Sequence, residues 1–148
     1  MNLETKINND LKEAMKNKDQ VALRGIRAIK AAILLFKTDG SGLELNEEKE
    51  IKLLQKLLKQ RQDSLDIYTK QNRDDLALVE REEMEIIQRY LPEQMSEEEL
   101  KKMIKNIIIE TGASGIKDMG KVMGLASQNL AGKADGKTIA SLVKELLT

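Results

Sequence analysis

Aliphatic residues that recur every three or four positions constrain this chain more than any other feature. In the first segment Leu3, Ile7, Leu11 and Met15 are spaced four apart. This spacing places their side chains on one face of a helix, whereas a half-buried strand would alternate apolar and polar residues. The same rhythm runs through the rest of the chain, and no segment shows a convincing strand pattern or internal repeat. The sequence therefore predicts an all-α protein.

The composition agrees with a helical core built from aliphatic side chains. The 148 residues include two tyrosines, one phenylalanine and no tryptophan, while 41 % of the residues are hydrophobic. Helical bundles can bury a core of this kind without aromatic residues. A chain of this length forms one medium domain or two small ones.

The apolar periodicity and its end signals divide the chain into seven helices. We expect them over approximately residues 3–17, 21–37, 46–68, 76–90, 96–111, 116–130 and 135–147. Asp19, Asn46 and Asp135 are predicted N-caps, because their side chains accept hydrogen bonds from the first free amides of a helix. Ser96 and Glu99 form the pattern of a capping box.

The only proline, Pro92, predicts the main boundary of the chain. Its ring disfavours helical backbone at Leu91 and prevents a helix from continuing through it. Four longer helices precede this point and three shorter ones follow it. We therefore expect an N-terminal domain resembling a four-helix bundle over residues 1–92, and a C-terminal three-helix domain over residues 96–148.

Several classes of chemistry are excluded by residues that the chain lacks. It has no cysteine and no histidine, which removes thiol nucleophiles, Ser-His-Asp chemistry and ordinary zinc sites. The acid-rich segments 80–85 and 97–99 are interpreted as a solvated helix face and a helix cap, since neighbouring carboxylates on one helix point apart. We nominate no catalytic, cofactor-binding or metal-binding residue.

Charge and the start of the chain bear on partners and location. The formal net charge is zero, from 25 basic and 25 acidic residues, so any contact with nucleic acid must come from a local patch. Residues 1–18 are polar and amphipathic, unlike the apolar core of a signal peptide, and no apolar run approaches 18 residues. We expect a cytoplasmic protein without membrane contact.

Two glycines in the last third need an explanation, because glycine costs about 1 kcal/mol relative to alanine inside a helix. Gly120 and Gly124 are four apart and share a helix face. One interpretation is that they let this helix pack tightly on a neighbouring helix, with Met119 and Met123 filling gaps. The other is that an RNA backbone approaches the bare face, flanked by Lys117 and Lys121.

Two further segments allow both a structural and a functional interpretation. Residues 132–137 combine a left-handed helix terminator at Gly132 with a helix cap, and Lys133 and Lys137 could hold a phosphate beside the amides of a helix N-terminus. Arg24, Arg27 and Lys30 make a short basic stripe at three-residue spacing. That stripe is either a solvated helix face or a contact for RNA or an acidic partner.

Five segments together resemble the GatB/YqeY family, in matching order and spacing over nearly the whole chain. They are Lys59-Gln-Arg-Gln-Asp-Ser64, Asn72-Arg-Asp-Asp-Leu76, Tyr90-Leu-Pro-Glu-Gln94, Asp118-Met-Gly-Lys-Val-Met-Gly124 and Gly132-Lys-Ala-Asp135. The resemblance is closest to the free-standing YqeY-like proteins. The C-terminal domain is similar to the helical tail of the B and E subunits of tRNA-dependent amidotransferases.

The resemblance implies an accessory role in tRNA handling. In the amidotransferases the tail is implicated in holding tRNA, whereas phosphorylation and transamidation occur in a separate cradle domain with no counterpart here. The family label, carbon–nitrogen ligase with glutamine as amido-N donor, would therefore apply without its chemistry. Where such tails often place Asn-Pro, this chain has Asp135-Gly136, which adds a negative charge beside a possible phosphate position.

The sequence thus predicts an amidotransferase-tail-like accessory protein that is not catalytic alone. Its expected partners are tRNA, an amidotransferase or another aminoacyl-tRNA-handling enzyme. The candidate nucleic-acid-binding residues are Lys117, Gly120, Lys121, Gly124, Lys133, Lys137, Arg27 and Lys30. The main alternative is a helical protein–protein interaction module with no RNA ligand, and a self-sufficient amide ligase ranks third.

Overall fold

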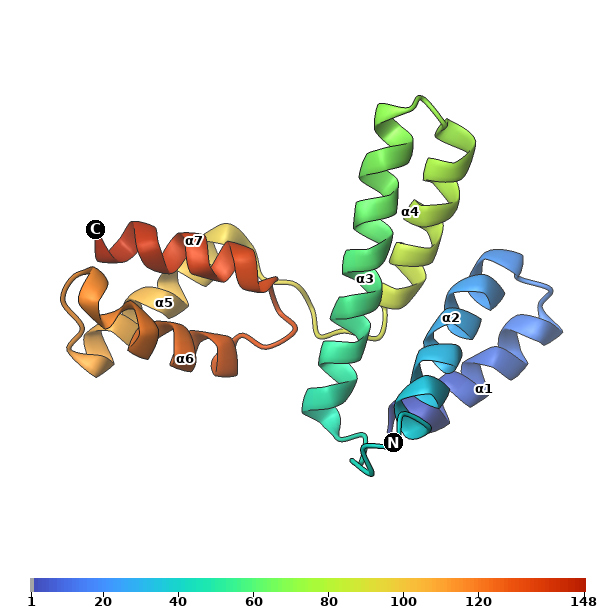
Figure 1. Ribbon diagram of the computed structural model, residues 1–148, viewed down its shortest axis with the longest axis horizontal. Helices are drawn as coiled ribbons and strands as arrows, with labels where there is room; N and C mark the ends of the chain where they lie inside the picture. Colours follow the sequence, from blue (N-terminus) through green and yellow to red (C-terminus); the bar gives the residue numbers. More distant parts are fainter. Residues whose placement is uncertain (1) are drawn as a thin grey trace. The chain divides into compact units, whose positions relative to one another are not determined.

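A computed structural model describes residues 2–148 of the protein. All its regular elements within these residues are helical (Figure 1). They are α1 (Leu3–Lys16), α2 (Gln20–Lys37), α3 (Glu47–Lys70), α4 (Asp74–Gln88), α5 (Glu97–Thr111), the short 3₁₀ turn η1 (Ile116–Asp118), α6 (Met119–Asn129) and α7 (Gly136–Leu147). The all-α prediction is confirmed.

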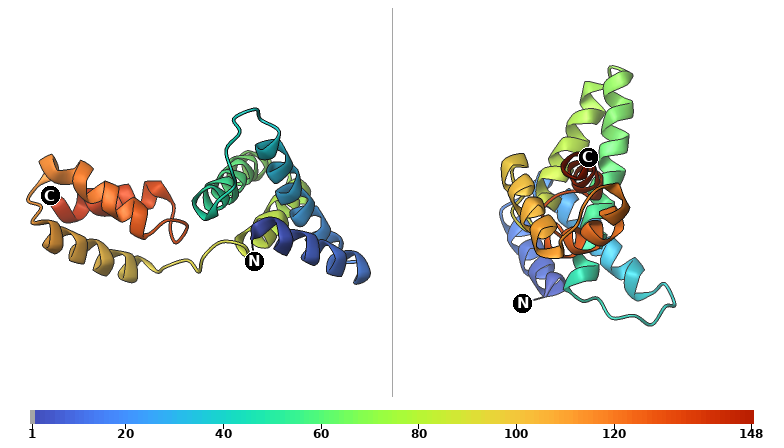
Figure 2. Two further views of the ribbon diagram at one scale, coloured as in Figure 1. Left: turned by 90° about the horizontal axis from the view of Figure 1, so that it is seen from below. Right: turned by 90° about the vertical axis from the view of Figure 1, so that its left-hand side faces the viewer.

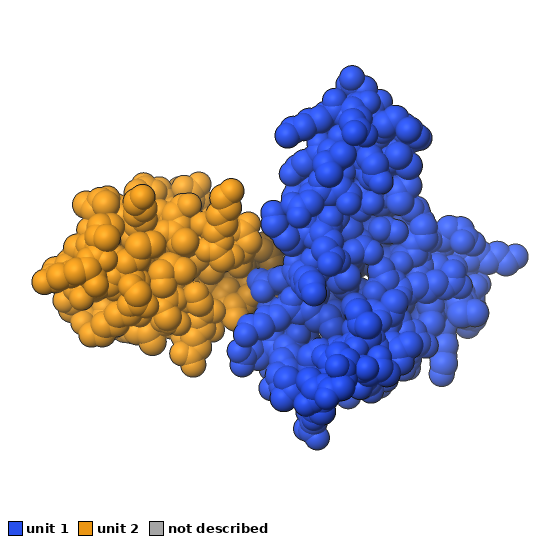
Figure 3. Space-filling view, viewed as in Figure 1, with its two compact units in different colours: residues 1–91 blue, residues 92–148 orange. Residues whose placement is uncertain are grey.

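The chain divides into two compact units, residues 1–91 and residues 92–148 (Figure 3). The division falls between Leu91 and Pro92, the position at which proline prevents helical backbone from continuing. Each unit has its own buried apolar core. That each unit folds independently as a domain stays a prediction.

The N-terminal unit consists of two helical hairpins, α1–α2 and α3–α4, which pack together mainly through α2 and α4 (Figures 1 and 2). This arrangement is more open than a closed four-helix bundle. Ile7, Ile29, Leu54 and Ile87 are fully buried in its core. On α3, a helix of 24 residues, Leu54 is the only buried residue, so most of α3 is covered from one side only.

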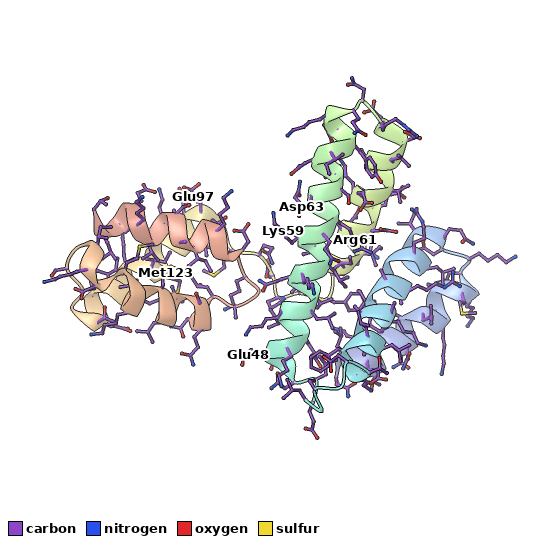
Figure 4. All side chains as sticks on the ribbon, viewed as in Figure 1. Glu48, Lys59, Arg61, Asp63, Glu97 and Met123 are labelled. Atoms are coloured by element: carbon purple, nitrogen blue, oxygen red, sulfur yellow. The ribbon has the colours of Figure 1, made fainter. Side chains whose placement is uncertain are left out.

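Two polar contacts join different parts of the N-terminal unit. On the α3–α4 hairpin, Arg61, which is labelled in Figure 4, donates from Nε to Glu83 Oε2 at 3.1 Å. Both side chains are mostly buried. Beyond the end of α4, the Tyr90 hydroxyl donates to Asp10 Oδ2 on α1 at 2.5 Å. The second contact connects the last part of the unit to its first helix.

The C-terminal unit packs α5, α6 and α7 against one another. Ile104, Val122, Leu130 and Val143 are fully buried in its core. The segment leading into α5 is held to the connection between α6 and α7 by two hydrogen bonds, from the Met95 amide to the Lys133 carbonyl at 3.0 Å and from Gln94 Nε2 to the Gly132 carbonyl at 2.7 Å. These hydrogen bonds hold the segment that precedes α5 in place.

The predicted helix starts are confirmed by their side-chain caps. Asp19 accepts from the Ala22 amide at 3.1 Å, Asn46 from the Lys49 amide at 2.9 Å and Asp135 from the Thr138 amide at 2.6 Å. Ser96 and Glu99 form both hydrogen bonds of the capping box. Each cap satisfies an amide that the first helical turn leaves free.

Two helix boundaries differ from the sequence prediction. The helix predicted from Ile116 begins as the 3₁₀ turn η1. Gly115, just before it, has φ +80°, and Asp118 accepts from the Ser114 amide at 2.8 Å. Together they tighten the backbone at the start of this helix. The helix α4 starts at Asp74 and ends at Gln88, before Tyr90. Tyr90 is therefore outside the helix and free to reach Asp10.

Candidate nucleic-acid interface

Gly120 and Gly124 lie on the exposed side of α6. A Cβ atom placed on either glycine would find no heavy atom within 4 Å. The opposite side of α6 is buried through Val122 and Ala126, which are fully inaccessible. The interpretation that these glycines pack α6 tightly on a neighbouring helix is therefore wrong. They leave the backbone of α6 bare on its outer side.

The methionines between the glycines do contribute to packing. Met119 and Met123 are half-buried and pack against the core of the C-terminal unit, and Figure 4 labels Met123. Because α6 has 3.6 residues per turn, the methionines and the glycines fall on different sides of the helix. The segment therefore separates into a core side and an open side.

Two lysines flank the start of the open side. Lys117 is exposed on η1, and Lys121 is exposed on the first turn of α6. Lys121 Nζ donates to the Thr111 carbonyl near the end of α5 at 3.3 Å, where a cation also complements the negative end of the helix dipole. Neither lysine forms an ion pair within residues 2–148. We call Lys117, Gly120, Lys121 and Gly124 the open face of α6.

Lys133 and Lys137 lie at the other end of α6. Lys133 follows the end of α6 at Asn129 and Lys137 lies on the first turn of α7, and α6 rises about 12 Å from Lys121 to that end. Lys133 is half-buried, and its carbonyl accepts from the Met95 amide. The structure therefore divides the four candidate lysines into two pairs.

A carboxylate already occupies the start of α7. Asp135 accepts from the Thr138 amide, and this backbone hydrogen bond is the main cause that lowers the pKa of Asp135 below its ordinary value. The aspartate is therefore held in its charged form at the helix N-terminus. A phosphate docking beside Lys133 and Lys137 would have to compete with this negative charge for the same amides.

Arg27 and Lys30 belong to the N-terminal unit, on α2. Both are exposed, while Arg24, the third residue of the predicted stripe, lies 3.6 Å from Glu82 Oε2 of α4. Of the eight candidate residues, the structure gathers the four of the open face of α6 on one surface. It places the other four elsewhere on the chain.

Two exposed apolar residues beside the open face were missed by the sequence analysis. Ile116 on η1 is 47 % exposed and Leu125 on α6 is 38 % exposed. Their positions fit the helical apolar rhythm, so the pattern assigns them to the core. For Leu125, the signal that could have found it is its angular position on α6, away from Ala126.

The described residues form neither a membrane span nor a cluster of metal ligands. None of the helices within residues 2–148 combines the length and the apolarity needed to cross a bilayer. The same residues bring no group of three or more acidic side chains into an arrangement that could hold a metal ion.

Fold and surface define a class of all-α protein with two helical units, the second presenting a bare, weakly basic helix face. The chain belongs to the Yqey-like protein family, whose sequence model matches residues 4–147. The resemblance to the GatB/YqeY family is thereby confirmed over nearly the whole chain.

Three curated relatives that are similar to this chain are named "Altered inheritance of mitochondria protein 41, mitochondrial". The relative from Lachancea thermotolerans is 33 % identical over 141 residues, covering 91 % of this chain and 73 % of the relative. The one from Meyerozyma guilliermondii is 45 % identical over 82 residues, covering 55 % and 42 %. The one from Pyrenophora tritici-repentis is 28 % identical over 141 residues, covering 93 % and 77 %.

These names contradict the expected cytoplasmic location, because the relatives are named as mitochondrial proteins. The absence of an apolar core in residues 1–18 bears only on a secretory signal. Mitochondrial targeting segments are amphipathic and rich in arginine instead, so a polar start was no argument for the cytoplasm. The names mention neither RNA nor amide transfer, and both of these stay predictions.

Proposed function

We propose that the C-terminal unit binds structured RNA of the tRNA type through the open face of α6, and that the protein acts as an accessory factor without catalysing amide transfer itself. The observation that supports this most strongly is the open space around Gly120 and Gly124. Both glycines weaken the helix by about 1 kcal/mol each relative to alanine. Since internal packing does not use them, close approach of an external backbone offers a reason for their presence.

The chemistry of the face suits a phosphate backbone contacted at few points. Lys117 and Lys121 provide two cations beside a helix without side chains at Gly120 and Gly124. Structured RNA is recognised largely by shape, 2′-hydroxyl and phosphate contacts. With about two phosphates neutralised, binding should be weak and its log–log slope against salt should be about −2, since each contact contributes about −0.9.

The proposal excludes independent amidotransferase activity because the chain offers no recognisable site for it. It has no histidine or cysteine to serve as general base or nucleophile. Its two units are small helical assemblies, and nothing in the sequence resembles the cradle domain of the amidotransferases. We therefore expect no ATP-dependent transfer of glutamine nitrogen to a misacylated tRNA by the pure protein.

The experiment is a titration of the full chain with unmodified tRNA at several salt concentrations. Lys117→Ala/Lys121→Ala should reduce the magnitude of the salt slope by between one and two and weaken binding. Lys102→Ala/Lys105→Ala is the matched control, because it removes two exposed lysines from α5 of the same unit. An absence of tRNA binding by the parent at low salt, or equal losses in both variants, would reject the proposal.

A second candidate function, a protein-interaction module without an RNA ligand, is favoured by Ile116 and Leu125. These exposed apolar side chains border the open face, and aliphatic groups contribute more to a protein interface than to a phosphate contact. Leu125→Ser distinguishes the two functions. It should leave tRNA affinity within about twofold of the parent if RNA is the ligand.

A further inference from the structure

A second surface, on the N-terminal unit, has its own recognition chemistry. The helix α2 spans 18 residues and contains four basic residues and no acidic one. Its inner side, including Ile26, Ile29 and Ile33, is buried in the core of the unit. The charge therefore lies entirely on the outer side of α2.

Two leucines follow the basic residues along the outer side of α2. Arg27 is followed at offsets of three, four, seven and eight residues by Lys30, Ala31, Leu34 and Leu35, which places all five on one helix face. We call these five residues the α2 stripe. Leu34 is 63 % exposed and Leu35 is 71 % exposed. The stripe is cationic in its first half and apolar in its second.

The two charges within the stripe are uncompensated. Arg24 lies near Glu82, and Lys37 pairs with Glu4. In contrast, Arg27 and Lys30 form no ion pair within residues 2–148. Two free cations next to two exposed leucines form a surface that is not accounted for by the packing of its own unit.

From this charge and apolar pattern we propose that the α2 stripe docks an acidic amphipathic helix of a partner protein. Such a helix lays apolar residues at positions i, i+3, i+4 and i+7 against an exposed face. Its acidic residues would meet Arg27 and Lys30, and its apolar residues would cover Leu34 and Leu35. The contact spans nine residues of α2, from Arg27 to Leu35, with a rise of about 12 Å.

Acidic residues at the end of the stripe favour a helix over a phosphate-bearing surface. Glu4 and Glu44 line a hollow of about 330 Å³ together with Lys37 and Leu43, and Asp39 is the second residue after the end of α2. An anionic bilayer or an extended RNA would meet these carboxylates along with the stripe. A helix about 10 Å wide can contact the stripe alone.

The test uses the full chain and a synthetic helical peptide of defined composition. The peptide carries three glutamates in its first two turns and leucines at helical spacing in the next two. Backbone amide signals are followed by NMR as the peptide is added. We expect shifts concentrated on residues 27–35, and about tenfold weaker binding for Arg27→Glu/Lys30→Glu. A peptide with lysines replacing its glutamates should restore binding to that variant.

Matched controls separate this proposal from non-specific binding of the peptide. Lys12→Glu/Lys16→Glu changes two exposed lysines of α1 in the same unit and should bind the peptide as the parent does. Leu34→Ser should weaken peptide binding at least fivefold. The proposal is overturned if the peptide does not shift residues 27–35, or if both charge-reversed variants lose affinity equally. It is also overturned if only phosphatidylserine vesicles or tRNA perturb the stripe.

Discussion

Gly25 of α2 lies so close to Ile86 of α4 that a Cβ atom on Gly25 would stand 2.5 Å from the Ile86 Cβ. Of the four glycines inside helices, Gly25, Gly120, Gly124 and Gly136, it is the one whose Cβ would meet a neighbouring helix. It lies where the two hairpins of the N-terminal unit join. A glycine that mediates helix packing is thus present in the chain, but on α2 and not on α6.

Gly25→Ala should destabilise the N-terminal unit, since the added methyl group would force α2 and α4 apart. Over-packing of this kind costs about 1–3 kcal/mol. Gly124→Ala is the control and should stabilise its helix by about 1 kcal/mol through helix propensity, because its Cβ enters open space. Urea unfolding followed by circular dichroism measures both. Equal unfolding free energies for the parent and Gly25→Ala would contradict the close packing of α2 on α4 at Gly25.

Tyr90→Phe should destabilise the N-terminal unit by about 1 kcal/mol at pH 7, since it removes the hydrogen bond to Asp10. Burial, followed by the hydrogen bond to Asp10, raises the pKa of Tyr90 above its ordinary value. A group whose pKa is raised by folding contributes stability that is complete below its unfolded pKa, about 10, and is lost as pH rises through the folded pKa.

The parent and Tyr90→Phe should therefore differ in unfolding free energy by a constant amount from about pH 6 to pH 9. At higher pH the difference should shrink as the phenol of the parent ionises. Chemical unfolding of both proteins at pH 7 and pH 11 tests this. If the difference in unfolding free energy instead grew with pH, the Tyr90 hydroxyl would not be acting as a hydrogen-bond donor.

Asp135→Asn should leave stability nearly unchanged, because asparagine is as good an N-cap as aspartate, whereas Asp135→Ala should cost about 1 kcal/mol. The same Asp135→Asn variant also distinguishes the two ends of α6. If RNA uses the open face of α6, tRNA affinity should change less than about twofold. A severalfold gain at low salt would indicate that a phosphate docks at the start of α7 instead.

The two-unit division predicts where proteases act first. The loop between α2 and α3 is exposed, and its Gly40 and Gly42 adopt positive φ angles, so it should be cut before any helix centre. A second early cut is expected near Glu93, although the hydrogen bonds at Gln94 and Met95 should slow it. Mass spectrometry of timed digests identifies the sites. Early cleavage near Leu54 or Val79 would refute the division.

Local chemistry explains which parts of this fold are readable from sequence. The caps at Asp19, Asn46 and Asp135 were predictable, because each needs only a short polar side chain next to free amides. The boundary at Pro92 was predictable for a similar reason, since the proline ring acts on its immediate neighbours.

Tertiary relationships account for what the sequence did not predict. Gly25 reads as an isolated glycine in a helical pattern, and its partner Ile86 belongs to a different hairpin. Gly120 and Gly124 read equally well as packing or as open surface, and only the placement of α5 and α7 decides between them. The separation of Lys121 from Lys133 likewise depends on α6 remaining helical as far as Asn129.

The central claim, that the outer side of α6 is an open binding surface, is tested most directly by Gly120→Leu/Gly124→Leu. The measurement pairs the thermal unfolding midpoint of this variant with its affinity for tRNA at low salt. The two leucines enter open space, so the midpoint should stay the same or rise, while the blocked backbone should weaken tRNA binding at least tenfold. Unchanged tRNA affinity in a variant that folds as well as the parent would contradict the claim.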